Sequence, residues 1–311
     1  MEYLLILPVI LVYSFQGIFM KIYSNNYTPN AEDSSTVYSV INGLFVALCT
    51  LVFRFIMRGF GFNLTPTVLI LAAVNVAALF FFNKALVEAS ARGPYAMVSI
   101  FMLSGGIVIP LAVSLFYGES LNLTRYIGIV VMFVAFVLLC YERGERTEKK
   151  PGFYLYCIAL AVANGIYGTI LTLEKTYEEG VNNDELIILT YFFTAVVSVV
   201  LLFIKTKRAP AIATDSAEKP ATEQPRFIDS FRLNGRAVAF ALGASTCTAI
   251  GINLLALCLQ YINVGVLYTM ENGGVMVASA LLALALFREK INLQKWIGIL
   301  VAAGSTVLLT I

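Results

Sequence analysis

Ten stretches, each of about twenty mostly apolar residues, constrain the fold of this chain more than any other feature. A helix needs about 20 such residues to cross the hydrocarbon core of a bilayer. Lipid offers no hydrogen-bond partner to the backbone, so each stretch must satisfy its own N–H and C=O groups as a helix. The sequence therefore predicts an all-α membrane protein with transmembrane helices at 3–23, 35–57, 66–88, 95–117, 123–141, 153–174, 186–204, 236–260, 265–287 and 293–311.

Composition supports a membrane protein and excludes other classes. The 311 residues are 59% hydrophobic and 13% charged, whereas a soluble domain carries about 25% charged residues. The first expected partner is therefore the lipid bilayer, and we expect a multi-pass protein of the cell (inner) membrane. A net charge of +2 gives no case for a nucleic-acid partner.

One segment occurs twice. ESLNLTRYIGIVV (119–131) returns 170 residues later as EKINLQKWIGILV (289–301), with seven of thirteen positions identical. Upstream, Ser104-Gly105-Gly106 corresponds less strictly to Asn272-Gly273-Gly274. The chain thus reads as two copies of a five-helix unit, because each copy of the segment opens the last helix of its half.

The odd number of helices in each unit has a geometric consequence, because the second copy must enter the membrane from the opposite side. We therefore predict two inverted five-helix repeats, at 1–141 and 153–311, joined by a charged linker at 142–152. Residues 205–236, rich in Pro, Ala and charge, are predicted to form a flexible loop within the second repeat. Inverted repeats are typical of secondary transporters, whose substrate site lies near the midplane between the halves.

The run from Ala85 to Leu139 resembles the EamA-like, ten-helix branch of the drug/metabolite transporter (DMT) superfamily. The resemblance rests on a short turn of small residues before residue 95, on Pro110 in mid-helix and on Gly118-Glu119, with Arg288-Glu289 in the second half. It implies transport of amino acids, other metabolites, nucleobases or drugs. The small-multidrug relatives carry a proton-coupling glutamate in helix 1, where this chain has Gln16, which cannot titrate.

No arrangement of residues suggests an enzyme. The four aspartates lie in loops or at helix ends, and histidine is absent from the sequence. No nucleophile with a base and no phosphate-binding loop is present. The five cysteines lack the paired spacing of a disulfide framework or a zinc site. We therefore expect no catalytic residue, no metal and no cofactor.

Glu271 is the exceptional charged residue, about two turns inside the predicted helix 265–287. A charge at such a depth costs at least about 2.5–3.5 kcal/mol on insertion scales. It must face a wet cavity, pair with a cation or be protonated. We hypothesise that Glu271 binds a substrate amine or exchanges a proton; the alternative is a structural hydrogen bond or ion pair between helices.

Further candidates for substrate binding surround this position. Asn272-Gly273-Gly274 and Ser104-Gly105-Gly106 interrupt corresponding helices, which points to a transporter site, although close helix packing explains glycines equally well. Gln16 and Tyr167 each precede a glycine at corresponding positions and are predicted to line the cavity, as are Asn83, Lys84 and Asn253.

Two expectations about further polar residues have competing interpretations, and one does not. Lys84 either helps Asn83 to hold a substrate carboxylate or pairs with Glu88 at the membrane surface. Asn42 and Asn75 are expected to form hydrogen bonds between helices. Glu119 and Glu289 are expected to cap helix ends beside Arg125 and Lys295, with a role in gating as the alternative.

The sequence as a whole predicts a secondary transporter that moves a small metabolite, amino-acid-like or another small organic solute, by alternating access. Its energy source would be a proton gradient or exchange, and helices 3, 4, 8 and 9 would form the main cavity walls. The alternatives are a membrane scaffold or receptor without flux, and a channel. The sequence leaves both a monomer and a homodimer open.

Overall fold

The structure, a computed structural model, describes residues 2–27, 33–59, 61–92, 95–118, 120–140, 151–208, 230–287 and 293–310. After a short 3₁₀ turn at Glu2–Leu5, these residues form α1 (Ile6–Asn26), α2 (Ser34–Arg58), α3 (Pro66–Arg92), α4 (Tyr95–Phe116), α5 (Leu123–Cys140), α6 (Phe153–Glu178), α7 (Asn183–Arg208), α8 (Gly235–Tyr261), α9 (Val264–Phe287) and α10 (Leu293–Thr310).

Each of these helices coincides with a predicted transmembrane segment. Five helices are long and apolar enough to cross a membrane, and shorter apolar stretches lie in α1, α4, α5 and α10. Many large apolar side chains on the outer surface are exposed, among them Ile56, Ile70 and Phe116, as expected where lipid rather than water surrounds the protein. The predicted all-α, multi-pass membrane fold is confirmed.

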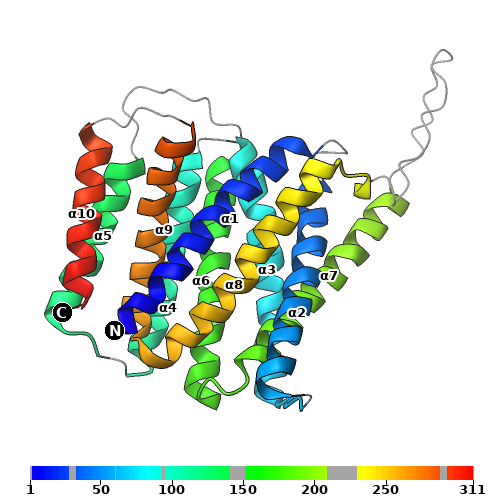
Figure 1. The fold of residues 1–311 in the computed structure, drawn as a ribbon, viewed down its shortest axis with the longest axis horizontal. Helices are drawn as coiled ribbons and strands as arrows, with labels where there is room; N and C mark the ends of the chain where they lie inside the picture. Colours follow the sequence, from blue (N-terminus) through cyan, green and yellow to red (C-terminus); the bar gives the residue numbers. More distant parts are fainter. Residues whose placement is uncertain are drawn as a thin grey trace.

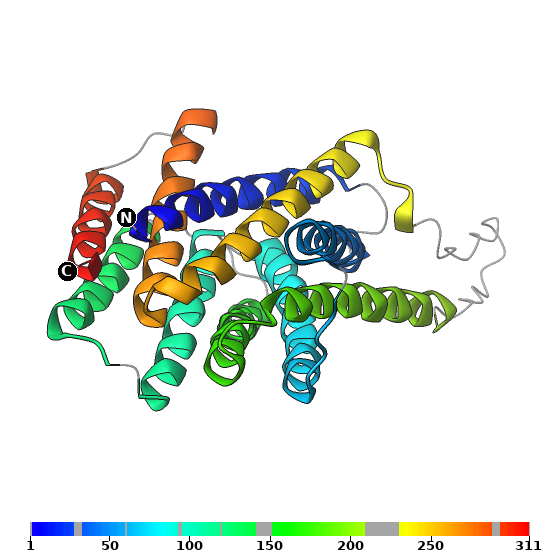
Figure 2. The ribbon, with the colours of Figure 1, turned by 60° about the horizontal axis from the view of Figure 1, so that its bottom comes forward.

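The helices pack as a bundle of crossing pairs. α1 runs beside α8 and also contacts α9, while α6 packs against α3 and α4 (Figure 1). α2 packs against α7, and α4 against α9. α5 and α10 form a pair at one edge of the bundle, away from α2 and α7 (Figure 2). Both termini lie at the same end of the bundle (Figure 1).

Small residues let the helices around the centre approach closely. A Cβ atom added to Gly105 of α4 would lie 2.0 Å from the carbonyl oxygen of Ala161 in α6, so the two backbones are in contact there. Gly43 of α2 is in the same position against the Tyr191 carbonyl of α7, at 2.5 Å. Such contacts are the usual means of packing helices in lipid, where apolar burial does not drive association.

Some expectations fall on parts of the chain that lie outside the described residues. Glu119 and Glu289 are among them, and so are most of the linker 142–152 and the central part of the loop 205–236. Of the residues expected to act beside the two glutamates, Arg125 is described: its backbone N–H donates to Oδ1 of Asn122, 2.9 Å away, at the start of α5.

Candidate functional site

A cavity of about 140 Å³ lies where helices from both halves of the chain cross. Its lining comes from α1, α2, α3, α4, α6, α7, α8 and α9, whereas no described residue of α5 or α10 contributes. The polar lining side chains are Tyr13, Gln16, Asn42, Asn83, Asn164, Tyr167, Tyr191, Thr248, Tyr268, Glu271 and Asn272. The cavity wall thus combines a largely apolar surface with polar groups from several helices.

Glu271 of α9 is the single charged side chain among the residues that line this cavity. It is 9% exposed. Among the described residues its carboxylate forms no ion pair, and the hydrogen bond it accepts comes from Nδ2 of Asn272, 2.6 Å away. Asn272 Nδ2 also donates to the Tyr268 carbonyl at 2.8 Å, which fixes the amide. The carboxylate therefore faces the cavity without a cationic partner.

The neutral groups of the wall are held by bonds between helices. The hydroxyls of Tyr167 and Tyr191 lie 2.7 Å apart and join α6 to α7. Tyr268 donates to the Gly168 carbonyl at 2.6 Å and joins α9 to α6. Asn42 is different: its buried Oδ1 has no hydrogen-bond partner among the described residues. A buried acceptor without a partner is costly, so a ligand N–H that reached it would be stabilised.

Six of the residues predicted from the sequence border this cavity: Gln16, Asn83, Gly106, Tyr167, Glu271 and Asn272. The sequence placed them on five different helices, and the fold brings them to one place. Gly106 contributes by its lack of a side chain, because a Cβ atom there would lie 3.0 Å from Oδ1 of Asn272. Asn83 is buried and also donates to the Ser39 hydroxyl of α2 at 3.0 Å.

Three predicted glycines lie at helix contacts rather than at the cavity. Gly105 touches the α6 backbone, Gly273 packs against Met132 of α5, and Gly274 packs against Ile10 of α1. In two interrupted helices, the glycine signal therefore marks close packing at three positions and the cavity wall at Gly106.

The other three predicted residues also lie away from the cavity. Ser104 is half-buried on α4 and is not part of the lining. Lys84 is exposed, and Glu88 pairs with Arg92 instead. Asn253 donates to the Thr50 hydroxyl of α2 at 3.0 Å and lines a separate, largely apolar crevice of about 500 Å³ between α2 and α8.

Several lining residues were not predicted from the sequence, chiefly Tyr13, Tyr191, Thr248 and Tyr268, and also Asn42, expected to bond between helices. A positional signal existed for two of them. Tyr13 lies three residues before Gln16, and Tyr268 three residues before Glu271. Residues at this spacing share a helix face. Each tyrosine could therefore have been predicted to line the cavity beside its polar neighbour. Asn75 does bond between helices as expected, to Thr190 of α7 at 3.4 Å.

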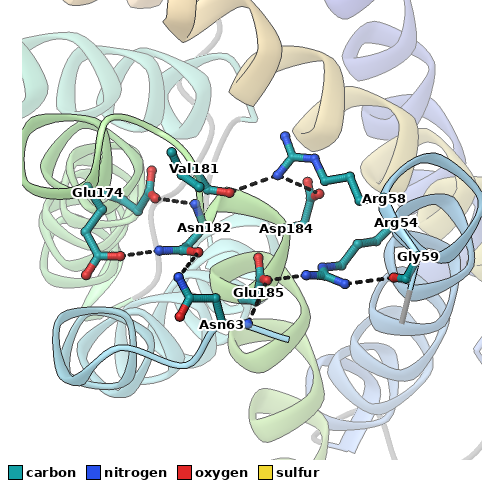
Figure 3. Close-up of polar contacts among 10 residues, drawn as sticks. Arg54, Arg58, Gly59, Asn63, Glu174, Val181, Asn182, Asp184 and Glu185 are labelled. Atoms are coloured by element: carbon teal, nitrogen blue, oxygen red, sulfur yellow. Dashed lines mark hydrogen bonds and ion pairs between the residues drawn. The ribbon is translucent and has the colours of Figure 1, made fainter. Parts of the chain in front are cut away.

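A second polar group lies at the end of the bundle where α2 ends and α7 begins; we name it the Arg54 cluster (Figure 3). Its members are Arg54, Arg58, Asn63, Thr65, Glu174, Glu178, Asn182, Asp184 and Glu185. Arg54 Nη2 lies 2.5 Å from Glu185 Oε1, and both side chains are almost completely buried. Arg54 also donates to the Gly59 carbonyl at 3.1 Å.

Two asparagines connect the loop between α2 and α3 to the loop between α6 and α7 at the Arg54 cluster. The Asn63 backbone N–H donates to Glu185 Oε1 at 3.2 Å, and its side chain donates to Asn182 Oδ1 at 3.1 Å. The Asn182 backbone N–H donates to Glu174 at 2.8 Å, and its side chain donates to Glu178. Figure 3 shows the resulting chain of bonds from the end of α6 across to α2.

The fold and the cavity together define a multi-pass, helical membrane protein with an internal cavity, and comparison with known proteins gives the family. The EamA-like transporter family matches residues 154–311, about half of the chain. The chain belongs to the EamA-like transporter family, and it is a membrane transporter of the DMT type. The resemblance seen in the sequence is confirmed. The members of this family are transporters rather than enzymes.

A solved structure described as "Crystal structure of protein" has the same fold. It superposes with a TM-score of 0.71, covers 99% of this chain and 96% of its own, and is 14% identical in sequence. At that identity the likeness establishes the fold alone. No curated protein matches the chain in sequence.

Proposed function

We propose that this protein is a secondary transporter that moves a small organic solute across the cell (inner) membrane by alternating access. The observation that carries the proposal is the internal cavity walled by α1–α4 and α6–α9, with Glu271 and other polar side chains in its lining. A cavity between two halves of a bundle can open to either side when the halves rock against each other. α3, α4, α8 and α9, the expected main walls, contribute to it alongside four other helices.

The pattern of helix packing supports two inverted repeats at 1–141 and 153–311. The two-fold relation of such repeats exchanges α1 with α6, α2 with α7, α3 with α8, α4 with α9 and α5 with α10. It therefore turns the pair α1–α8 into α6–α3, and the pair α1–α9 into α6–α4. All four of these pairs pack together. The pairs α2–α7, α4–α9 and α5–α10 map onto themselves and also pack. A two-fold axis in the membrane plane, passing through the cavity, accounts for this pattern.

The chemistry of the wall supports a substrate that carries an amine. Glu271 supplies the sole charge in the lining, and Asn42 Oδ1 supplies a buried acceptor without a partner. Tyrosine rings at positions 13, 167, 191 and 268 border the same space, and aromatic faces attract ammonium groups. A substrate that carries a negative charge and no amine would be repelled by the Glu271 carboxylate.

Size narrows the substrate further. A dry protein cavity of about 150 Å³ holds one benzene molecule, and the cavity here measures about 140 Å³. Without widening, it therefore accepts a solute of the size of a small amine or a small amino acid. When no amine is bound, a proton on Glu271 would neutralise the site, which suits proton-coupled transport or exchange.

The test is counterflow in proteoliposomes, with a substrate found by a thermal-shift screen of small amines, since a ligand stabilises by mass action. We expect trans-stimulation, which a channel, scaffold or receptor would not show. Glu271→Gln should reduce the exchange rate at least tenfold and remove its pH dependence. Glu88→Gln, which alters a carboxylate away from the cavity, is the matched control. Unchanged rate and pH dependence in Glu271→Gln would refute the role of this carboxylate.

A further inference from the structure

α2 and α7 are joined by an ion pair at each of their two ends. Arg54, four residues before the end of α2, pairs with Glu185, the third residue of α7. Lys205, three residues before the end of α7, pairs with Asp33, which directly precedes α2, at 2.8 Å. The two helices run in opposite directions, so the ion pairs lie at opposite ends of the bundle.

The cavity lies between these ion pairs. Asn42 of α2 and Tyr191 of α7 are both in its lining. At a rise of 1.5 Å per residue, Asn42 lies about 18 Å along α2 from Arg54, and Tyr191 about 21 Å along α7 from Lys205. A solute could therefore leave the cavity past one ion pair or past the other.

The two ends differ in strength. Arg54 and Glu185 side chains are 7% and 2% exposed, and the asparagine bonds of the Arg54 cluster surround them. At the other end, Lys205 is 47% exposed and Asp33 is 7% exposed. Asp33 also accepts a hydrogen bond from the Ser230 hydroxyl at 3.1 Å, and Tyr27 donates to the Ser230 carbonyl at 3.1 Å. We name Asp33, Lys205, Ser230 and Tyr27 the Asp33 cluster.

We propose that the Arg54 and Asp33 clusters are the two gates of the transport cycle, and that the Asp33 gate opens more readily. The inference rests on the alternating access proposed above. Rocking of the halves must part α2 from α7 at one end at a time, and these ion pairs hold the ends together. A pair whose lysine is already about half hydrated gains less from closure, whereas a pair in which both partners are buried resists opening.

Distance measurements between spin labels test the gates without any substrate. The background replaces the five native cysteines by alanine. One label pair, at Ile56 and Val181, spans the Arg54 end, where both side chains are exposed. A second pair, at Thr36 and Ile204, spans the Asp33 end. Double electron–electron resonance spectroscopy then gives the distribution of label-to-label distances at each end, with the protein in lipid nanodiscs.

The expected result is a single short distance at the Arg54 end and an additional longer component at the Asp33 end. Glu185→Gln should add a longer component at the Arg54 end, and the charge-preserving Arg54→Lys should not. Asp33→Asn should enlarge the longer component at its own end alone. These opposite, local responses would support two gates.

Two outcomes would overturn the proposal. In one, neither neutralising variant changes its own end. In the other, each broadens both ends equally, as general loosening of the fold would do. The measurement does not depend on transport: loss of the gates with intact, Glu271-dependent counterflow would refute the gates alone. Failure of counterflow with responsive gates would refute the transport function alone.

Discussion

Two buried glutamates in different regions of this molecule have contrasting surroundings. In the Arg54 cluster, Glu185 lies against an arginine at 2.5 Å and accepts a backbone N–H as well. In the cavity, Glu271 is similarly buried, but its bonding partner is an asparagine amide and no described residue pairs it with a cation. A buried carboxylate that is paired with a cation holds two helices together, whereas a buried carboxylate without a cation is available to a ligand. We propose that this difference distinguishes a structural carboxylate from one that binds a ligand.

The largest effect should come from Arg54→Ala. It leaves Glu185 buried without its cation, and breaking a buried pair in this way costs about 3–5 kcal/mol of stability. Thermal denaturation in detergent should show a much lower midpoint. Arg58→Ala, one helical turn away, is the matched control, because Arg58 is 45% exposed and its ion pair spans 3.4 Å; a loss below about 1 kcal/mol is expected. Similar losses in both variants would contradict the comparison.

Two isosteric changes compare the carboxylates directly. Glu185→Gln should lower stability by about 2 kcal/mol, because it removes a charge-assisted hydrogen bond. Glu271→Gln should leave stability unchanged or raise it by about 1 kcal/mol, because it removes a buried charge without a cation. Denaturation curves of the two variants, recorded side by side at neutral pH, provide the measurement. If Glu271→Gln were the more destabilising, its carboxylate would be structural.

Two adjacent glycines of α4 allow a residue at a helix contact to be compared with a residue at the cavity wall. Gly105→Ala would drive a methyl group into the Ala161 backbone, and overpacking of this kind costs about 1–3 kcal/mol. The methyl group of Gly106→Ala would meet the side-chain ends of Asn164 and Asn272, which are hydrogen-bonded but can shift more easily than a helix backbone, so the loss of stability should be smaller. We expect the second variant to be stable yet to bind ligand more weakly in a thermal-shift titration. Equal stability losses would show that both glycines serve packing.

The smallest effect is expected for Lys205→Ala. Lys205 is half-exposed, and the buried Asp33 keeps its hydrogen bond from Ser230, so stability should fall by about 1 kcal/mol, well below the loss for Arg54→Ala. High salt should reduce the difference from the unmodified protein still further, because salt screens exposed charges. A loss as large as that of Arg54→Ala would remove the proposed asymmetry between the two ends.

The sequence predicted the helices well because hydropathy alone determines where a chain crosses lipid. Even so, the predicted helix at 186–204 was too short at both ends; α7 extends from Asn183 to Arg208. Its first turn is acidic and its last turn basic, and a search for apolar residues passes over such turns. Glu271 was found for a related reason, since a charge within an apolar run is conspicuous.

The rest of the site depends on how the helices are rotated and which of them cross. Lys84 and Asn83 are neighbours in sequence, but one is exposed and the other borders the cavity. An almost wholly apolar helix gives no strong signal of which face turns inward. The position of Tyr191 in the cavity wall depends on the contact between α6 and α7. The ion pair of Arg54 with Glu185 depends on the contact between α2 and α7, and its two residues are more than a hundred positions apart in the chain. No local pattern contains that information.

The pair of helices at the edge of the bundle has a wider consequence. The most nearly identical segment of the two halves, Ile-Gly-Ile at 127–129 and 297–299, lies on α5 and α10, where the Ser305 hydroxyl of α10 donates to the Gly128 carbonyl of α5 at 2.7 Å. These helices add nothing to the described cavity wall. The repeated segment and the proposed substrate cavity thus lie on different helices. A sequence search with the repeated segment is therefore expected to find carriers that share this helix packing, whereas a comparison of α1, α6 and α9 is expected to group carriers that share a solute.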